Sequence, residues 1–292
     1  MEELDLLILG AGWTATFLIP LLQKHALSFA ATTTTGRPVA GHPTIPFRFT
    51  PDDPSAIAAL PRARTVLVTF PLYGPGPSKI LVEGYTSTHQ SASAASNSTF
   101  RFIQLGSTGI WQGKGGQTFT LAEEGPWVDR HSSYDGANPR AVAEDELLKL
   151  GGCVLNLAGL WGGQREPRNW VPRVAKTKEE VKGKKSLHLV HGMDVARGLL
   201  EVVRCDGGKW EEHGKGQRWM LTDGFVYDWW ALMAGWAEGS DGEVSEQAKW
   251  VGELMEEEKV KALPRSMEAL GRCYDSREFW RVFGVVPVKA RV

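Results

Sequence analysis

The sequence predicts an α/β fold in which helices cover both faces of a parallel sheet, and three observations support it. Short apolar stretches alternate with helical stretches through most of the chain. The apolar stretches are nearly continuous hydrophobic runs, which is typical of strands that are buried on both faces. Glycine-rich or proline-containing turns follow most of these runs. We therefore expect a doubly wound parallel sheet, with a mainly helical cap formed by the C-terminal part.

The first element carries the clearest motif. An apolar run at residues 4–9 leads into Gly10-Ala11-Gly12-Trp13-Thr14-Ala15, and a helical stretch follows. A strand, a G-x-G-x-x-A turn and a helix in this order form a dinucleotide-binding motif. Gly10 permits the tight turn, and Gly12 lets the backbone approach a pyrophosphate. The N–H groups at the start of the helix, at Trp13 and Thr14, are expected to bind the phosphates.

The other elements follow from the same patterns. Further strands are expected at residues 27–32, 45–49, 65–70, 100–105, 153–157, 187–191 and 218–221. Helices are expected from about residue 78, at 139–150, from 193, and at 227–236 and 245–261. Prolines near residues 45–49 predict a less central strand there. The serine-, alanine- and threonine-rich stretch 87–99 is expected to be a helix end and a loop.

Distinctive turns follow five of the predicted strands. They lie at residues 10–12, 35–37, 70–71, 107–109 and 159–163. Because ligands of open parallel sheets bind at the carboxyl ends of the strands, we expect one cleft to gather these turns.

Composition excludes several classes of protein. The 292 residues are 42% hydrophobic and 23% charged with a net charge of −1, which is typical of a soluble globular chain with no bias toward nucleic acid or membranes. No apolar run approaches the ~20 residues of a membrane span, and the acidic start argues against a signal peptide. Cys153, Cys205 and Cys273 are far apart and predict free thiols in a reducing compartment. No spacing suggests a metal site. We therefore expect a cytoplasmic protein with a small-molecule partner; the sequence does not define its oligomeric state.

Five segments together resemble motifs of the extended and atypical short-chain dehydrogenase/reductase superfamily, the NAD(P)-dependent epimerase/dehydratase group. They are residues 8–13, 66–71, 105–111, 157–165 and 190–196, in the family's order. The resemblance implies a Rossmann-like core in which Phe70, Pro71 and Gly159 adjoin the cofactor. It also implies that residues 1–165, with 186–204 returning to them, form the NADP-binding core. Residues 166–185 and 205–292 would form a substrate-side cap in a single integrated unit.

The end of the second predicted strand indicates which cofactor binds. A carboxylate at this position would bind the ribose 2′-OH of NAD, but there is none between Ser28 and Pro38. Arg37 stands there instead, behind four threonines that end at Thr35. A guanidinium and several hydroxyls suit a 2′-phosphate. We therefore expect NADP(H) to be favoured over NAD(H), with a solvated turn at Arg37 as the alternative.

The family's catalytic pattern is incomplete in this chain. The family uses a Ser or Thr, a Tyr and a Lys one helical turn later, with the tyrosinate as acid/base. Ser107 and Thr108 match the serine position. Tyr134 is followed four residues later by an asparagine, and no Tyr-x-x-x-Lys occurs elsewhere. Alignment on a glutamate of the following helix puts Arg140 at the lysine position. We expect Tyr134 to transfer the proton and Arg140 to hold a ribose hydroxyl or phosphate, with His131 as the alternative acid/base.

Three functions are consistent with these residues. The first is an NADP-dependent oxidoreductase acting on a small carbonyl or related substrate, with Trp111 and Trp161 walling an aromatic pocket. The second is a redox-inactive NADP-binding sensor or regulatory protein that lacks the Tyr/Lys dyad. The third is an enzyme of the nucleotide-sugar epimerase or dehydratase type, in which Arg165 would bind a phosphate.

Overall fold

The computed structural model describes residues 3–53, 55–90, 100–112, 125–238, 242–290 and 292. Among these residues, a seven-stranded sheet has the order β11-β7-β5-β4-β1-β2-β3, and every neighbouring pair is parallel. Its strands are β1 (Leu4–Leu9), β2 (Phe29–Thr33), β3 (Ile45–Pro46), β4 (Ala63–Val68), β5 (Arg101–Ser107), β7 (Cys153–Leu157) and β11 (Arg218–Leu221). The predicted parallel α/β sheet is confirmed, and the proline-containing β3 lies at its edge.

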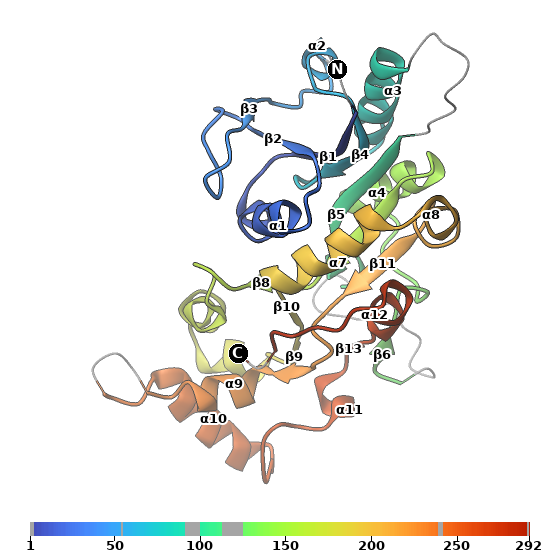
Figure 1. Cartoon of the computed structure of the whole chain (residues 1–292). Helices are drawn as coiled ribbons and strands as arrows, with labels where there is room; N and C mark the ends of the chain where they lie inside the picture. Colours follow the sequence, from blue (N-terminus) through green and yellow to red (C-terminus); the bar gives the residue numbers. More distant parts are fainter. Residues whose placement is uncertain (1–2, 54, 91–99, 113–124, 239–241, 291) are drawn as a thin grey trace.

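Helices cover both faces of the sheet (Figure 1). One face carries α1 (Trp13–Lys24) and α7 (Gly192–Arg204), and the other carries α3 (Pro77–His89) and α4 (Pro139–Lys149). Side chains alternate along β1, so that Leu6 and Ile8 pack on the first face, whereas Leu7 and Leu9 pack on the second. Burial on both faces explains why the buried part of this strand, residues 6–9, is apolar without alternation.

A third apolar cluster lies in the cap. It is formed by α5 (Val171–Val174), α6 (Lys178–Lys182), α9 (Trp229–Gly235) and α10 (Glu246–Glu257). Figure 1 shows α9 and α10, in orange, on the side of the molecule away from β1 to β4. Trp229 and Trp230 are buried in this cluster, and further tryptophans pack against it. Much of the tryptophan content therefore serves packing in the cap.

Short elements connect the cap to the sheet. In the described residues, three further sheets have two strands each: β10 (Leu189–His191) with β8 (Gly159–Trp161), β12 (Tyr227–Asp228) with β9 (Ser186–Leu187), and β13 (Cys273–Tyr274) with β6 (Trp127–Val128). The remaining helices are short: α2 (Ser55–Ala58), η1 (Thr108–Trp111), η4 (Pro167–Trp170), α8 (Gly207–His213), α11 (Met267–Leu270) and α12 (Arg277–Phe283).

The segment after α12 returns to the start of α7. The Asp194 side chain is fully buried, and its carboxylate accepts hydrogen bonds from the backbone N–H groups of Val288 and Lys289, both at 2.9 Å. Arg197 donates to the carbonyl of Val286 at 2.7 Å. This segment is therefore fastened to the helix that covers the sheet.

The structure corrects the expected boundaries in several places. Residues 205–292 were assigned to the cap, but β11 is the seventh strand of the sheet, and its Trp219 packs 5.9 Å from the ring of Phe279 in α12. The strand expected at 187–191 is divided at His188, whose Nε2 accepts a hydrogen bond from the backbone N–H of Tyr274. Residues 227–228 form β12 rather than the start of a helix. The predicted loop at 91–99 lies outside the described residues.

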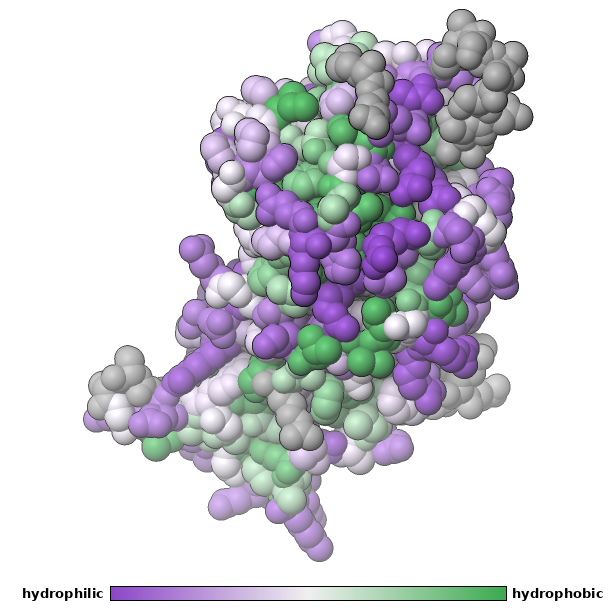
Figure 2. All heavy atoms as spheres, viewed as in Figure 1, coloured by the Kyte–Doolittle hydropathy of each residue, from purple (hydrophilic) through white to green (hydrophobic). Residues whose placement is uncertain are grey.

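Other features agree with a globular chain. Cys153, Cys205 and Cys273 are free cysteines, as predicted, and all three are buried. None of the helices in the described residues combines the length and apolar character needed to cross a membrane. Within the same residues, no group of three or more His, Cys, Asp or Glu side chains is arranged to hold a metal ion. Figure 2 shows hydrophilic side chains over much of the visible face, with smaller hydrophobic patches among them.

Candidate cofactor-binding and active site

The turn after β1 is built around Gly10. Its φ of +85° lies in the region that favours glycine. A Cβ at this position would lie 2.9 Å from Cδ1 of Phe70 and 3.0 Å from Oγ1 of Thr69, at the end of β4. At Gly12 an added Cβ would have only the carbonyl oxygen of Gly10 nearby, at 3.8 Å. The backbone at Gly12 is thus open to close approach by a ligand.

The N-terminus of α1 is available to an anion. No side chain caps this helix, which begins at Trp13. Helix α3 also follows a glycine, but there the carboxylate of Glu146 accepts hydrogen bonds from the N–H groups of Gly76 and Lys79 at 2.8 and 3.1 Å. Within the described residues, no carboxylate does the same at α1. Its first N–H groups and the helix dipole therefore suit a phosphate.

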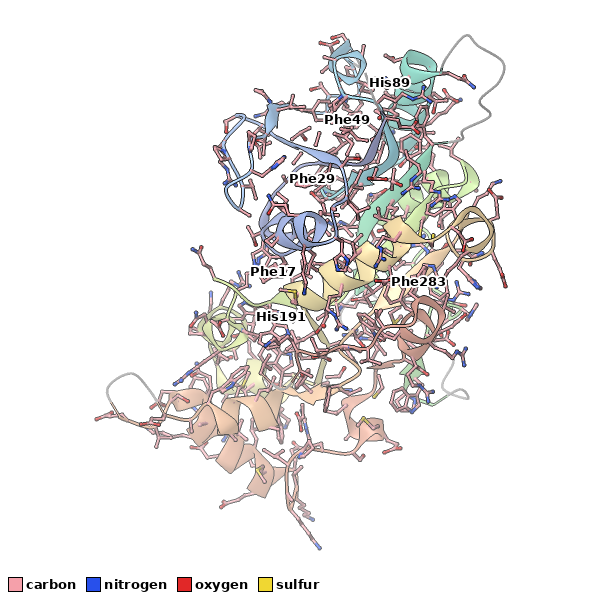
Figure 3. The ribbon with its side chains drawn as sticks, in the orientation of Figure 1. Phe17, Phe29, Phe49, His89, His191 and Phe283 are labelled. Atoms are coloured by element: carbon pink, nitrogen blue, oxygen red, sulfur yellow. The ribbon has the colours of Figure 1, made fainter. Side chains whose placement is uncertain are left out.

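A cavity of about 430 Å³ opens beside this turn, where β1, β2 and β4 end. Gly10, Phe70 and Pro71, three of the residues predicted for the cofactor site, line it. Phe49, labelled in Figure 3, also lines the cavity, and its ring stacks on that of Phe70 with 6.0 Å between ring centres. An aromatic cavity next to an uncapped helix N-terminus has the character that the adenosine half of a dinucleotide needs.

The cationic side chain at this cavity is Arg48 rather than Arg37. All four residues are exposed, but Arg48 and Thr34 line the cavity, whereas the predicted Thr35 and Arg37 do not. The carbonyl of Arg37 accepts a hydrogen bond from the Thr44 hydroxyl at 2.8 Å. Sequence reasoning missed Arg48 because the motif places the ribose-binding residue after the second strand. The sequence Phe47-Arg48-Phe49, an arginine between two aromatic residues, was the pattern that could have indicated a cationic and aromatic cavity here.

Trp13 ties the loop after β8 to the start of α1. Its Nε1 donates a hydrogen bond to the carbonyl of Gly162 at 3.1 Å, and the guanidinium of Arg165 lies 4.4 Å from the centre of its ring. Phe17, one turn further along α1, packs 5.0 Å from Trp13 and 5.4 Å from His191, as Figure 3 illustrates for Phe17 and His191. Arg165, predicted for the substrate pocket, therefore lies against Trp13, the first residue of α1.

Ser107 and Thr108 differ in accessibility. Ser107 ends β5, and its Oγ accepts a hydrogen bond from the N–H of Gly109 at 3.1 Å. Thr108 is buried, with its hydroxyl directed at the carbonyl of Leu157 at 3.4 Å, and its own carbonyl accepts a hydrogen bond from Tyr274. Of the two residues predicted to position a substrate, only Ser107 is partly exposed.

The structure does not support Tyr134 as the proton donor. Its hydroxyl donates a hydrogen bond to Oδ1 of Asp145 at 2.7 Å, and the guanidinium of Arg218 lies 4.7 Å from its ring centre. Burial and the hydrogen bond to Asp145 raise the pKa of Tyr134, which is the opposite of what a catalytic tyrosinate needs. His131, the alternative, is exposed, and its Nε2 lies 3.0 Å from a carboxylate oxygen of Glu278.

A buried polar network surrounds Tyr134 and supports the end of β5. Arg218 donates to the carboxylates of Glu144 and Asp145. Asn156 donates to Glu144 at 2.8 Å and to the carbonyl of Ser107 at 3.0 Å. Burial raises the pKa of Glu144, and Arg218 opposes that rise. The network thus holds the backbone of Ser107 through Asn156.

Trp111 is a core residue, and the prediction that it walls a pocket is wrong. It is 1% exposed, and its Nε1 donates a hydrogen bond to the carbonyl of Ser132 at 3.0 Å. Trp161 is half-buried, lies 4.6 Å from the ring of His191, and its Nε1 has no hydrogen-bond partner among the described residues. Gly159 permits the close pairing of β8 with β10, since a Cβ there would lie 2.8 Å from the side chain of Leu189.

Arg140 lies in the first turn of α4, close to the segment that leaves β4. Its guanidinium is 5.8 Å from the ring centre of Tyr73. The N–H of Gly74 donates a hydrogen bond to the carbonyl of Pro139 at 2.8 Å, which ties the two segments together. Tyr73 also lines the 430 Å³ cavity, and sequence reasoning missed it because no motif includes it.

Comparison with known proteins shows the fold. No protein-family model and no curated protein matches this chain in sequence. Among solved structures, vestitone reductase from alfalfa matches with a TM-score of 0.65 and 16% identity, over 98% of this chain and 93% of the other. UDP-glucose 4-epimerase from Bifidobacterium longum, in complex with NAD+ and UDP, gives 0.62 and 16%, over 98% and 94%. A short-chain dehydrogenase/reductase superfamily protein from Agrobacterium tumefaciens with bound NAD gives 0.61 and 14%, over 98% and 93%. The chain thus shares the Rossmann-type fold of these solved structures.

Proposed function

We propose that this protein is an NADP(H)-dependent oxidoreductase of the short-chain dehydrogenase/reductase type that acts on a small carbonyl compound. The observation that carries the proposal is the aromatic cavity at Gly10 and Phe70, beside the uncapped start of α1. Structures that share the fold hold NAD, and one of them is a reductase. The three free, buried cysteines are consistent with a reducing compartment such as the cytoplasm.

Each part of the site has a role in this proposal. The turn at Gly10 and Gly12 and the first N–H groups of α1 would hold the pyrophosphate. Phe70 and Phe49 would pack against the adenosine, and the hydroxyl of Ser107 would orient the oxygen of the substrate. Once bound, the nicotinamide would exchange hydride with the carbonyl carbon.

The preference for NADP(H) is assigned to Arg48. Residues 28–49 contain no Asp or Glu, so no carboxylate of this stretch is available for the ribose 2′-OH of NAD. The Arg48 guanidinium at the rim of the cavity suits a 2′-phosphate. Its positive charge attracts the phosphate, and its planar N–H groups can donate hydrogen bonds to two phosphate oxygens at once.

Calorimetric titration with NADPH and NADH tests both the preference for NADP(H) and its assignment to Arg48. We expect the wild type to bind NADPH more tightly than NADH. Loss of a hydrogen-bonded charge is worth about 1.5–3 kcal/mol, so Arg48→Ala should weaken NADPH roughly 10- to 150-fold and leave NADH nearly unchanged. Arg37→Ala is the matched control and should change neither affinity more than about twofold. Equal weakening of both cofactors by Arg48→Ala would contradict the assignment.

A redox-inactive NADP(H) sensor is the second candidate. It is favoured by the absence of a Tyr-x-x-x-Lys pair and by the engagement of the Tyr134 hydroxyl with Asp145. Absorbance at 340 nm follows NADPH consumption with a panel of aldehydes and ketones. Tight NADPH binding without consumption of any compound would favour the sensor over the enzyme.

A further inference from the structure

A tight turn after β8 carries Arg165. The N–H of Gly162 donates a hydrogen bond to the carbonyl of Arg165 at 2.8 Å, and the N–H of Arg165 donates one to the carbonyl of Gly162 at 3.1 Å. Gly162 and Gly163 have φ values of +102° and +61°, which favour glycine. A Cβ at Gly162 would collide with the imidazole ring of His191, labelled in Figure 3. The turn is therefore confined to one conformation, and the Arg165 side chain leaves it from a fixed backbone.

This turn is attached to the first residue of α1. The Nε1 of Trp13 donates to the carbonyl of Gly162 at 3.1 Å. A Cβ at Gly163 would lie 3.5 Å from the ring of Phe17, one turn further along α1. The guanidinium of Arg165 lies 4.4 Å from the centre of the Trp13 ring. Because helical side chains lean toward the helix N-terminus, the ring of this first residue extends past the first turn of α1. The guanidinium therefore lies on the side of α1 to which the proposed function assigns the pyrophosphate.

Arg165 brings a positive charge to this place without a counterion. Among the residues that the structure describes, its guanidinium forms no ion pair, and the first turn of α1 contains no acidic side chain. The N-terminus of α1 itself carries a partial positive charge. A guanidinium beside this end of the helix is repelled by it unless an anion lies between them. The contact with the Trp13 ring holds the guanidinium there without neutralising it. The arrangement therefore suits an anion between Arg165 and the start of α1.

We propose that Arg165 binds the pyrophosphate of the cofactor; this rests on the proposed function. The first N–H groups of α1 hold one side of the pyrophosphate, and the guanidinium donates hydrogen bonds to its oxygens from the other side. This role replaces the expectation that Arg165 binds a phosphate of the substrate. NADPH and NADH share the pyrophosphate, so Arg165 contributes affinity for both. Arg48 differs, because its proposed partner, the 2′-phosphate, occurs only in NADPH.

Calorimetric titration of Arg165→Met with NADPH and NADH tests the assignment. We expect both cofactors to bind roughly 10- to 150-fold more weakly than to the wild type, and by the same factor, whereas Arg48→Ala should weaken NADPH alone. Arg168→Met is the matched control. Arg168 is also exposed, but its guanidinium donates to the carbonyl of Glu238, so both affinities should stay within about twofold. Unchanged binding of both cofactors to Arg165→Met would overturn the proposal, as would a loss confined to NADPH. Failure of the wild type to bind either cofactor would instead overturn the proposed function, and this assignment with it.

Two fragments of the cofactor separate the roles of the two arginines. Adenosine 2′-monophosphate carries the 2′-phosphate without a pyrophosphate, and ADP carries the pyrophosphate without a 2′-phosphate. Competition against NADPH measures the Kd of each fragment. Arg165→Met should weaken ADP roughly tenfold or more and leave adenosine 2′-monophosphate within about twofold, and Arg48→Ala should do the reverse. Equal weakening of both fragments by Arg165→Met, or a loss for adenosine 2′-monophosphate alone, would overturn the proposal.

Discussion

Replacing Arg218 by methionine should expose how much stability depends on the buried charges near Ser107. Arg218 donates to Glu144, to Asp145 at 2.7 Å and to Asn156 Oδ1 at 3.0 Å. The side chains of Arg218 and Glu144 are 7% and 1% exposed. In Arg218→Met, the Glu144 carboxylate stays buried, and within the described residues Asn156 is its remaining hydrogen-bond donor. Removing one partner of a buried ion pair costs about 3–5 kcal/mol, and we expect a loss of that size at pH 8.

The loss should shrink as the pH falls. Burial raises the pKa of Glu144, and Arg218 opposes that rise, so its removal should raise this pKa further. A carboxyl whose pKa in the folded protein exceeds its unfolded value binds protons more readily when folded. The folded variant is therefore stabilised relative to the unfolded chain as protons are added, and the cost should be smaller at pH 5.5 than at pH 8.

Urea unfolding followed by tryptophan fluorescence measures both effects, at pH 8 and at pH 5.5. Arg204→Met is the control, because Arg204 is half-exposed, its pair with Glu201 lies at the surface, and such pairs contribute at most about 1 kcal/mol. A cost below about 1 kcal/mol for Arg218→Met, or a cost that grows on acidification, would refute this account of the network.

Three further predictions concern single positions. Gly10→Ala should destabilise more than Gly41→Ala and abolish NADPH binding in calorimetry. Both glycines have φ above +70°, a strain of about 1–2 kcal/mol, but only Gly10 lacks room for a Cβ; equal melting temperatures would contradict this. Burial lowers the pKa of His188 to about 3 in the folded protein. In the unfolded chain this histidine has a pKa of about 6.5 and takes up a proton below that pH, so the stability that the neutral His188 contributes is lost as the pH falls below about 6.5. Between pH 7 and pH 5, urea unfolding should show that the wild type loses about 2 kcal/mol more of its free energy of unfolding than His188→Gln does. Burial raises the pKa of Asp223 to about 6, which contributes in the opposite direction. That contribution is the same in both proteins and cancels in the comparison. Asp194→Ala should release the segment after α12, so trypsin should cleave it faster than in the wild type; an unchanged rate would contradict the role of this carboxylate.

The fold was predictable because its signals are local. Strands buried on both faces give continuous apolar runs. The turn after β1 needs a residue that can adopt a positive φ, and the sequence shows this directly by placing glycine at position 10. The position of β11 was not predictable in the same way. Residues 218–221 were recognised as a strand, but their partner is β7, which lies more than 60 residues earlier in the chain. Such long-range pairing leaves no local mark, so the strand was assigned to the cap.

The surroundings of the candidate catalytic residues were predicted less well for the same physical reason. Tyr134 and Trp111 had suitable positions in the sequence, but their surroundings come from other segments. Asp145 and Arg218 engage Tyr134, and Ser132 receives the indole N–H of Trp111. Tyr73 has no motif, and only the fold brings it to Arg140.

The anchoring of the last segment by Asp194 has a consequence for biosynthesis. Val288 and Lys289 emerge from the ribosome 94 and 95 residues after Asp194. Until then the Asp194 carboxylate has Arg197 of the same helix, at 3.2 Å, as its partner, and its two backbone donors do not yet exist. The sheet can begin to assemble on the nascent chain, but α7 cannot seal its face with this contact until synthesis has passed residue 289.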